Sequence, residues 1–143
     1  ENTSIPCLQK QKINEMFTIE EAQNLIPWLK QICIEIGPLN KRSKVLSHQI
    51  KILELKLKGN GTNKAHQLLN KIQEKMTNTT NLINDKLITI EKKGILIKSI
   101  DSGLFDFPHL KDGKEVYLCW QEEENFLEFW HDINSGFAGR RKI

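Results

Sequence analysis

The spacing of apolar residues changes at Gly94, and this change constrains the fold more than any other feature of the sequence. Before Gly94, leucine and isoleucine recur at helical spacing. After it come three short runs rich in β-branched and aromatic residues, each bounded by turn residues: 95–100, 116–120 and 126–130. Asp112-Gly113 is a turn dipeptide that we expect to connect Phe107-Pro108-His109 to the strand at Val116. The sequence therefore predicts an α+β fold, with an N-terminal helix plus a long antiparallel helical hairpin, followed by a small antiparallel β-sheet.

The first predicted helix begins at Thr18. Its hydroxyl can accept a hydrogen bond from the backbone N–H of Glu21, whose carboxylate can reach back to the N–H of Thr18. Pro27 lies within the apolar pattern that follows, so we expect the helix to kink there or to restart at Trp28. Gly37-Pro38 is expected to end this helix and to separate it from the next one.

The helical hairpin is predicted from two further amphipathic runs. The first run ends at Gly59-Asn60-Gly61, and the second extends from about Thr62 to a stop at Gly94. A two-helix hairpin has a narrow apolar stripe, which either the rest of the chain or a second copy can cover. A homodimer through the hairpin is one of these two alternatives.

The length of 143 residues is enough for one domain with its own core. We expect residues 1–16 to be a loose leader and residues 17–143 a single domain, with a helical scaffold at 17–94 and a β-rich region at 95–143. The cysteines are few and odd in number, Cys7, Cys33 and Cys119, which argues against a disulfide framework. The sequence has neither a secretion signal nor a long apolar stretch, so we expect a cytoplasmic protein without a membrane span.

Charge is divided unevenly along the chain. Residues up to Ile100 include 16 basic and 9 acidic side chains, a net charge of +7, whereas residues from Asp101 onward have a net charge of −4. A basic helix face can bind nucleic acid, but solvated lysines produce the same pattern. Because no aromatic residues alternate with these lysines, the sequence offers no platform for base stacking, and nucleic-acid binding is the weaker hypothesis.

Unusual residue combinations gather between Gly103 and Arg140: Gly-Leu-Phe-Asp-Phe-Pro at 103–108, Leu-Cys-Trp at 118–120, Trp-His-Asp at 130–132 and Gly-Phe-Ala-Gly-Arg at 136–140. With the opening Phe17–Ala22 and Pro27-Trp28-Leu29, this series resembles the prokaryotic family catalogued as domain of unknown function 2203. The resemblance implies five polar motif positions: Asp106, Cys119, Glu124, His131 and Arg140. Glu123 stands where that family usually has glycine. The resemblance implies no activity.

Three kinds of chemistry fit these five residues. Cys119 and His131 can form a catalytic thiolate–imidazole pair, oriented by Asp106 or Glu124. Alternatively, Cys119, His131 and a carboxylate such as Glu124 can bind zinc as a cofactor. Arg140, with Glu124 and Asp106, can bind a small anionic ligand. Purely structural roles remain open for each: a buried thiol, a hydrogen-bonded imidazole, a turn carboxylate, and an arginine that fixes the tail.

The length of one turn decides whether Cys119 and His131 can meet. If residues 122–125 form a four-residue turn, Val116 lies opposite His131, and Cys119 faces the other side of the sheet. A three- or five-residue turn shifts the register and places both side chains on one face. We therefore consider two functions: a small binding or interaction protein whose C-terminal cluster binds a metal or an anion, and a cysteine- or metal-dependent enzyme of unknown substrate.

Overall fold

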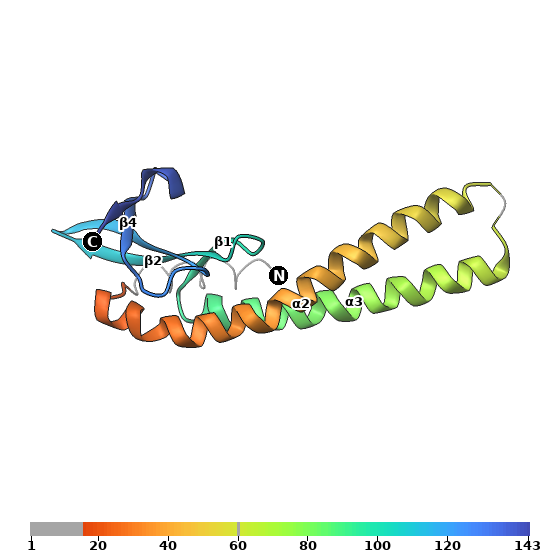
Figure 1. Ribbon diagram of the computed structural model, residues 1–143, viewed down its shortest axis with the longest axis horizontal. Helices are drawn as coiled ribbons and strands as arrows, with labels where there is room; N and C mark the ends of the chain where they lie inside the picture. The colour runs from red at the N-terminus through yellow and green to blue at the C-terminus, as the bar shows by residue number, and fades with distance from the viewer. Residues whose placement is uncertain (1–15, 60) are drawn as a thin grey trace, which may run out of the picture. The chain divides into compact units, whose positions relative to one another are not determined.

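The computed structural model describes residues 16–59 and 61–143, so the predicted leader lies outside the described residues apart from Met16, as does Asn60 of the glycine turn. The elements are two helices, α2 (Ile19–Leu57) and α3 (Asn63–Lys92), then β1 (Leu96–Ser99), β2 (Leu104–Lys111), β3 (Lys114–Gln121), β4 (Phe129–Asp132), a short 3-10 helix (Phe137–Gly139) and β5 (Arg141–Lys142) (Figure 1). The strands form one antiparallel sheet in the order β1-β2-β3-β4-β5. The predicted α+β class is confirmed.

The break that we predicted at Gly37-Pro38 is wrong, because α2 runs without interruption through Pro27 and Pro38. A proline inside a helix removes one backbone hydrogen bond and costs about 3 kcal/mol. Apolar residues of α2 are buried before, between and after the two prolines, including Ile26, Ile36 and Leu46. This burial favours one continuous helix over two shorter ones.

The other predicted helix boundaries, at Thr18, near Thr62 and at Gly94, are confirmed. The backbone N–H of Thr18 donates to Glu21 Oε1 and that of Glu21 donates to Thr18 Oγ1, both at 3.0 Å, which makes the predicted capping box. Thr62 Oγ1 accepts a hydrogen bond from the N–H of Ala65 at the start of α3. Gly94, with a φ of 91°, follows the end of α3, as expected for a left-handed C-terminal residue.

The chain divides into two compact units, and both helices extend through the two. The hairpin unit, Ile34–Lys86, contains the antiparallel pair made by the second part of α2 and most of α3. Leu46 and Ile83 are buried in it, and Lys86 donates to Glu35 Oε1 at 2.8 Å. Several apolar side chains of this unit stay exposed, among them Val45, Ile52 and Leu55 at 56%, 40% and 67%.

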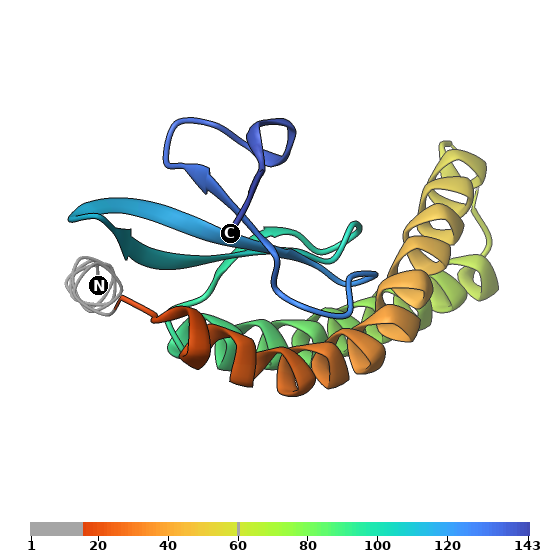
Figure 2. The same ribbon diagram turned by 60° about the vertical axis from the view of Figure 1, so that its left-hand side comes forward.

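The sheet unit comprises Leu87–Ile143 together with the described residues up to Cys33. Figure 2 shows the first part of α2 on one side of the sheet and the tail after β4 on the other. The N–H of Phe17 donates to the carbonyl of Pro108, and the Phe17 ring meets Phe107 edge-on at 5.3 Å. These contacts attach the start of the helix to the face that carries Phe105, Phe107, Leu118 and Trp120, which are all buried.

The turn between β2 and β3 agrees with the prediction. Asp112 and Gly113 have φ values of 52° and 78° and connect Lys111 to its partner Lys114. Two consecutive positive φ values are typical of the two-residue turns that suit the twist of a hairpin. None of the described helices is long and apolar enough to span a membrane.

Candidate metal centre

Three of the five predicted polar residues lie together on the sheet face opposite the helices. Asp106 pairs with Cys119 across β2 and β3, and Tyr117, two residues from Cys119, pairs with His131 on β4. Residues two apart on a strand point to the same face. Asp106, Cys119 and His131 therefore converge, and their potential ligand atoms all lie within 4.8 Å of one another. We call them the Asp–Cys–His cluster.

The register between β3 and β4 decides this convergence. Cys119 pairs with Phe129. Extending this register would bring Gln121 opposite Leu127, so the turn between them has five residues, 122–126. This is the odd turn length that places Cys119 and His131 on one face. The strand predicted at 126–130 instead begins at Phe129, because the N–H of Leu127 donates to Gln23 Oε1 of α2 rather than to the sheet.

His131 is held in a defined orientation. Its Nδ1 lies 2.8 Å from the backbone carbonyl oxygen of Asp132. A carbonyl oxygen only accepts hydrogen bonds, so Nδ1 carries a hydrogen and donates it. In the neutral ring, Nε2 then carries the lone pair, and Nε2 faces both carboxylate oxygens of Asp106, at 3.1 and 3.0 Å. A lone pair and a carboxylate repel each other unless a proton or a metal ion lies between them.

Cys119 completes the cluster as a buried, protonated thiol. Its side chain is inaccessible to solvent, and Asp106 and His131 are also buried. Burial raises the pKa of the Cys119 thiol to about 12, and the negative charge of Asp106 and a hydrogen bond to it add to this rise. The nearby positive charge of Arg140 lowers the pKa, but by less. Without a cation, the cluster therefore contains a thiol rather than a thiolate.

Glu124 and Arg140 pair with each other beside the Asp–Cys–His cluster, where Arg140 Nη2 also donates to the backbone carbonyl of Cys119 at 3.4 Å. Arg140 Nη2 donates to Glu124 Oε2 at 2.6 Å and to Oε1 at 2.7 Å, and Oε1 also accepts the N–H of Gln121 at 2.7 Å. The guanidinium lies over the rings of Phe129 and Phe137, at 3.9 and 4.5 Å from their centres. This arrangement fits the alternative in which the arginine fixes the tail. Among the described residues, the only buried side-chain polar atom without a hydrogen-bond partner is Arg140 Nε.

Two residues near the cluster were not identified from the sequence. Lys98 of β1 lies with its Nζ 3.9 Å from Asp106 Oδ2 and 5.2 Å from the centre of the Tyr117 ring. Tyr117 in turn meets the His131 ring edge-on at 5.7 Å. Tyr117 is two residues from Cys119 on β3 and so shares its face, a relation that the sequence pattern could have indicated. Lys98 belongs to no motif, and only the pairing of β1 with β2 brings it to Asp106.

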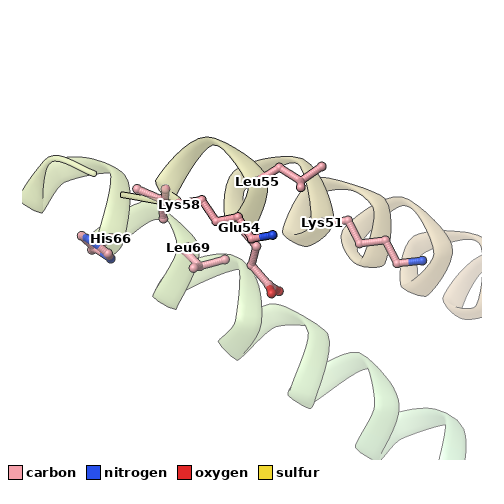
Figure 3. A pocket seen from close by; sticks show the side chains of 7 residues that line it. Lys51, Glu54, Leu55, Lys58, His66 and Leu69 are labelled. Atoms are coloured by element: carbon pink, nitrogen blue, oxygen red, sulfur yellow. The ribbon is translucent and has the colours of Figure 1, made fainter. Parts of the chain in front are cut away.

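The hairpin unit contains a separate groove near the turn between its helices (Figure 3). It has a volume of about 570 Å³ and is lined by Lys51, Glu54, Leu55, Leu57, Lys58, His66 and Leu69. One imidazole and one carboxylate occur among these residues, and the only group of three potential metal ligands in the described part of the chain is the Asp–Cys–His cluster. The groove therefore contributes nothing to the candidate metal centre.

Comparison with known proteins assigns a family. Neither the curated proteins nor the solved structures include a match to this chain. The sequence model of the family described as "Uncharacterized conserved protein (DUF2203)" matches residues 15–143, which include both helices, all five strands and the Asp–Cys–His cluster. The chain therefore belongs to the DUF2203 family, as its motifs predicted.

Proposed function

We propose that this protein binds a divalent transition-metal ion, zinc by preference, through Asp106, Cys119 and His131. The observation that carries the proposal is the orientation of His131, which donates Nδ1–H to a backbone carbonyl and directs Nε2 at a carboxylate. Histidines that bind metals usually donate their other N–H in this way, because the hydrogen bond fixes the tautomer and turns the ring toward the ion.

The separation of the ligand atoms supports the proposal. In a tetrahedral zinc site made of nitrogen, oxygen and sulfur, neighbouring ligand atoms lie about 3.3 to 3.6 Å apart. Nε2 of His131 is 3.0 Å from Asp106 Oδ2, and all three ligand atoms fall within 4.8 Å of one another. Small side-chain movements are enough to admit the ion.

The donor types favour zinc over the alkaline-earth ions. Thiolate and imidazole suit zinc, whereas Mg²⁺ and Ca²⁺ prefer oxygen ligands. A zinc ion would stabilise the thiolate of Cys119, whose proton would pass to solvent on binding. With Asp106 as the carboxylate, Glu124 is not needed as a ligand and can keep its ion pair with Arg140.

The alternative that Cys119 is a free nucleophile has less support. A thiol must ionise and reach its substrate to react. Cys119 is fully buried and its pKa is raised to about 12. We therefore propose a binding protein in which any catalysis would depend on the metal rather than on a free thiolate.

Calorimetric titration of metal-free protein with zinc tests the proposal. We expect one zinc per chain and a loss of at least about 100-fold in affinity when His131 is replaced by glutamine, because one of three ligands is removed. His109→Gln is the matched control. The Nδ1 of His109 also hydrogen-bonds a backbone carbonyl oxygen, that of Phe17 at 2.7 Å. His109, however, lies on the opposite sheet face from Asp106.

Two results would contradict the proposal. The first is the absence of any zinc binding by the unmodified protein, which would leave the cluster with a purely structural role. The second is equal zinc affinity in the His131→Gln and His109→Gln variants, which would place the ion elsewhere.

A further inference from the structure

We infer that the metal site binds a small carboxylate in its fourth position and that Lys98 holds this ligand. The inference rests on the proposed metal site and adds the class of ligand and the residue that selects it. Three protein ligands leave one position of a tetrahedral zinc ion for water or a substrate. Lys98 is the cation nearest the cluster on the β1 side, with Nζ 3.9 Å from Asp106 Oδ2.

The first argument is charge. A zinc ion, the thiolate of Cys119 and the carboxylate of Asp106 together are neutral, and His131 adds no charge when it binds the ion through Nε2. Lys98 then adds one positive charge beside a neutral centre. A ligand with a single negative charge balances the whole group, so opposite charges attract an anion to the fourth position more strongly than neutral water.

The second argument is the change of partner that metal binding imposes on Lys98. Lys98 lies beside the carboxylate of Asp106, with Nζ 3.9 Å from Oδ2. Once that carboxylate binds the ion, its charge is shared with the metal and attracts the ammonium group less strongly. A carboxylate ligand has two oxygens, so one can bind the metal while the other accepts a hydrogen bond from Lys98.

The third argument is access. The three metal ligands are buried, whereas the Lys98 side chain keeps 44% of its surface in contact with solvent. Its ammonium group also lies over the Tyr117 ring, which contacts His131. Lys98 and Tyr117 therefore connect the buried cluster to a partly exposed cation. Because the three side chains are buried, we expect only a small ligand to reach the ion.

Cobalt substitution tests the inference with acetate as the probe. Cobalt bound to Cys119 gives a thiolate charge-transfer band, and its visible spectrum changes when a fourth ligand is exchanged. We expect acetate to change the visible spectrum of the full-length protein in a saturable way. Replacing Lys98 by glutamine should weaken acetate binding about tenfold, since one charge-assisted hydrogen bond is lost.

Lys114→Gln is the matched control, because Lys114 is also a sheet lysine paired with an aspartate, Asp132, at 3.4 Å. It should bind acetate like the unmodified protein. A charge-transfer band together with a spectrum that acetate leaves unchanged, or with equal acetate affinity in the Lys98→Gln and Lys114→Gln variants, would overturn the inference and leave the metal site intact. A missing charge-transfer band would overturn the metal site and the inference with it.

Discussion

The ion pair between Arg140 and Glu124 gives the sharpest prediction about stability. Arg140 holds the tail against the sheet through two hydrogen bonds to one carboxylate and through contacts with Phe129 and Phe137. The Arg140 side chain is 9% exposed and that of Glu124 is 20% exposed. Replacing Arg140 by methionine keeps apolar contact with the rings but leaves the carboxylate without its cation.

The expected loss follows from this burial. Removing one partner of a fully buried ion pair costs about 3–5 kcal/mol, and a charge-assisted hydrogen bond contributes about 1.5–3 kcal/mol. Glu124 keeps some contact with water and the N–H of Gln121, so the lower part of this range applies. We expect Arg140→Met to reduce the free energy of unfolding of the sheet unit by about 3 kcal/mol.

The neighbouring residue provides the control. Arg141 is 64% exposed and lies 3.7 Å from Asp132, so Arg141→Met should cost about 0.5 kcal/mol. Tryptophan fluorescence during urea unfolding is a suitable assay because Trp28, Trp120 and Trp130 all belong to the sheet unit. If the two variants lose equal stability, or if Arg140→Met loses less than about 1 kcal/mol, our explanation of how the tail is held is wrong.

Three further predictions concern the turns, a second thiol and the hairpin. Gly103→Ala should reduce the free energy of unfolding by at least about 2 kcal/mol, because φ is 63° and an added Cβ would lie 2.5 Å from Glu122 Cβ. Gly113→Ala, with φ 78° and open space around it, should reduce it by about 1 kcal/mol. Equal losses of stability in thermal unfolding would contradict this reasoning. Burial, with the negative charge of Glu122, raises the pKa of Cys33 to about 12 from an ordinary value of 9.0, so the folded protein retains a proton that the unfolded chain loses as pH rises above 9. Stability should therefore fall above pH 9 by up to about 1.4 kcal/mol per pH unit on account of this thiol, and Cys33→Ala should remove that part of the slope; an unchanged slope would refute it. We expect a second copy of the chain to cover the exposed Val45, Ile52 and Leu55 of the hairpin unit, which carries 10 basic and 4 acidic residues, so self-association measured by sedimentation should increase with salt and be lost in Leu55→Glu. Association that weakens with salt or persists in Leu55→Glu would contradict this expectation.

Local signals in the sequence predicted local structure well. The capping box at Thr18 and Glu21, the stop at Gly94 and the Asp112-Gly113 turn each depend on a few neighbouring residues, and all three are present. The continuity of α2 could not be predicted in the same way. Whether a helix continues through Pro27 and Pro38 depends on which residues it packs against, and this packing exists only in the folded chain.

The candidate site was only partly predictable for the same reason. The motifs identified Asp106, Cys119 and His131, but whether they converge depends on the parity of the loop after β3, which the hydrogen bond between Leu127 and Gln23 of α2 helps to set. The pairing of Glu124 with Arg140 joins residues 16 positions apart through the path of the tail. Lys98 reaches Asp106 only because β1 pairs with β2, so no motif could have included it.

The metal content of the purified protein tests the central claim most directly. Elemental analysis should find one zinc per chain in the unmodified protein and none in His131→Ala, which lacks the Nε2 that faces Asp106. The His109→Ala protein should retain its zinc. An unmodified protein that contains no zinc after purification without chelators and binds none on addition, or a His131→Ala protein that keeps one zinc per chain, would contradict the assignment of the Asp–Cys–His cluster as a metal site.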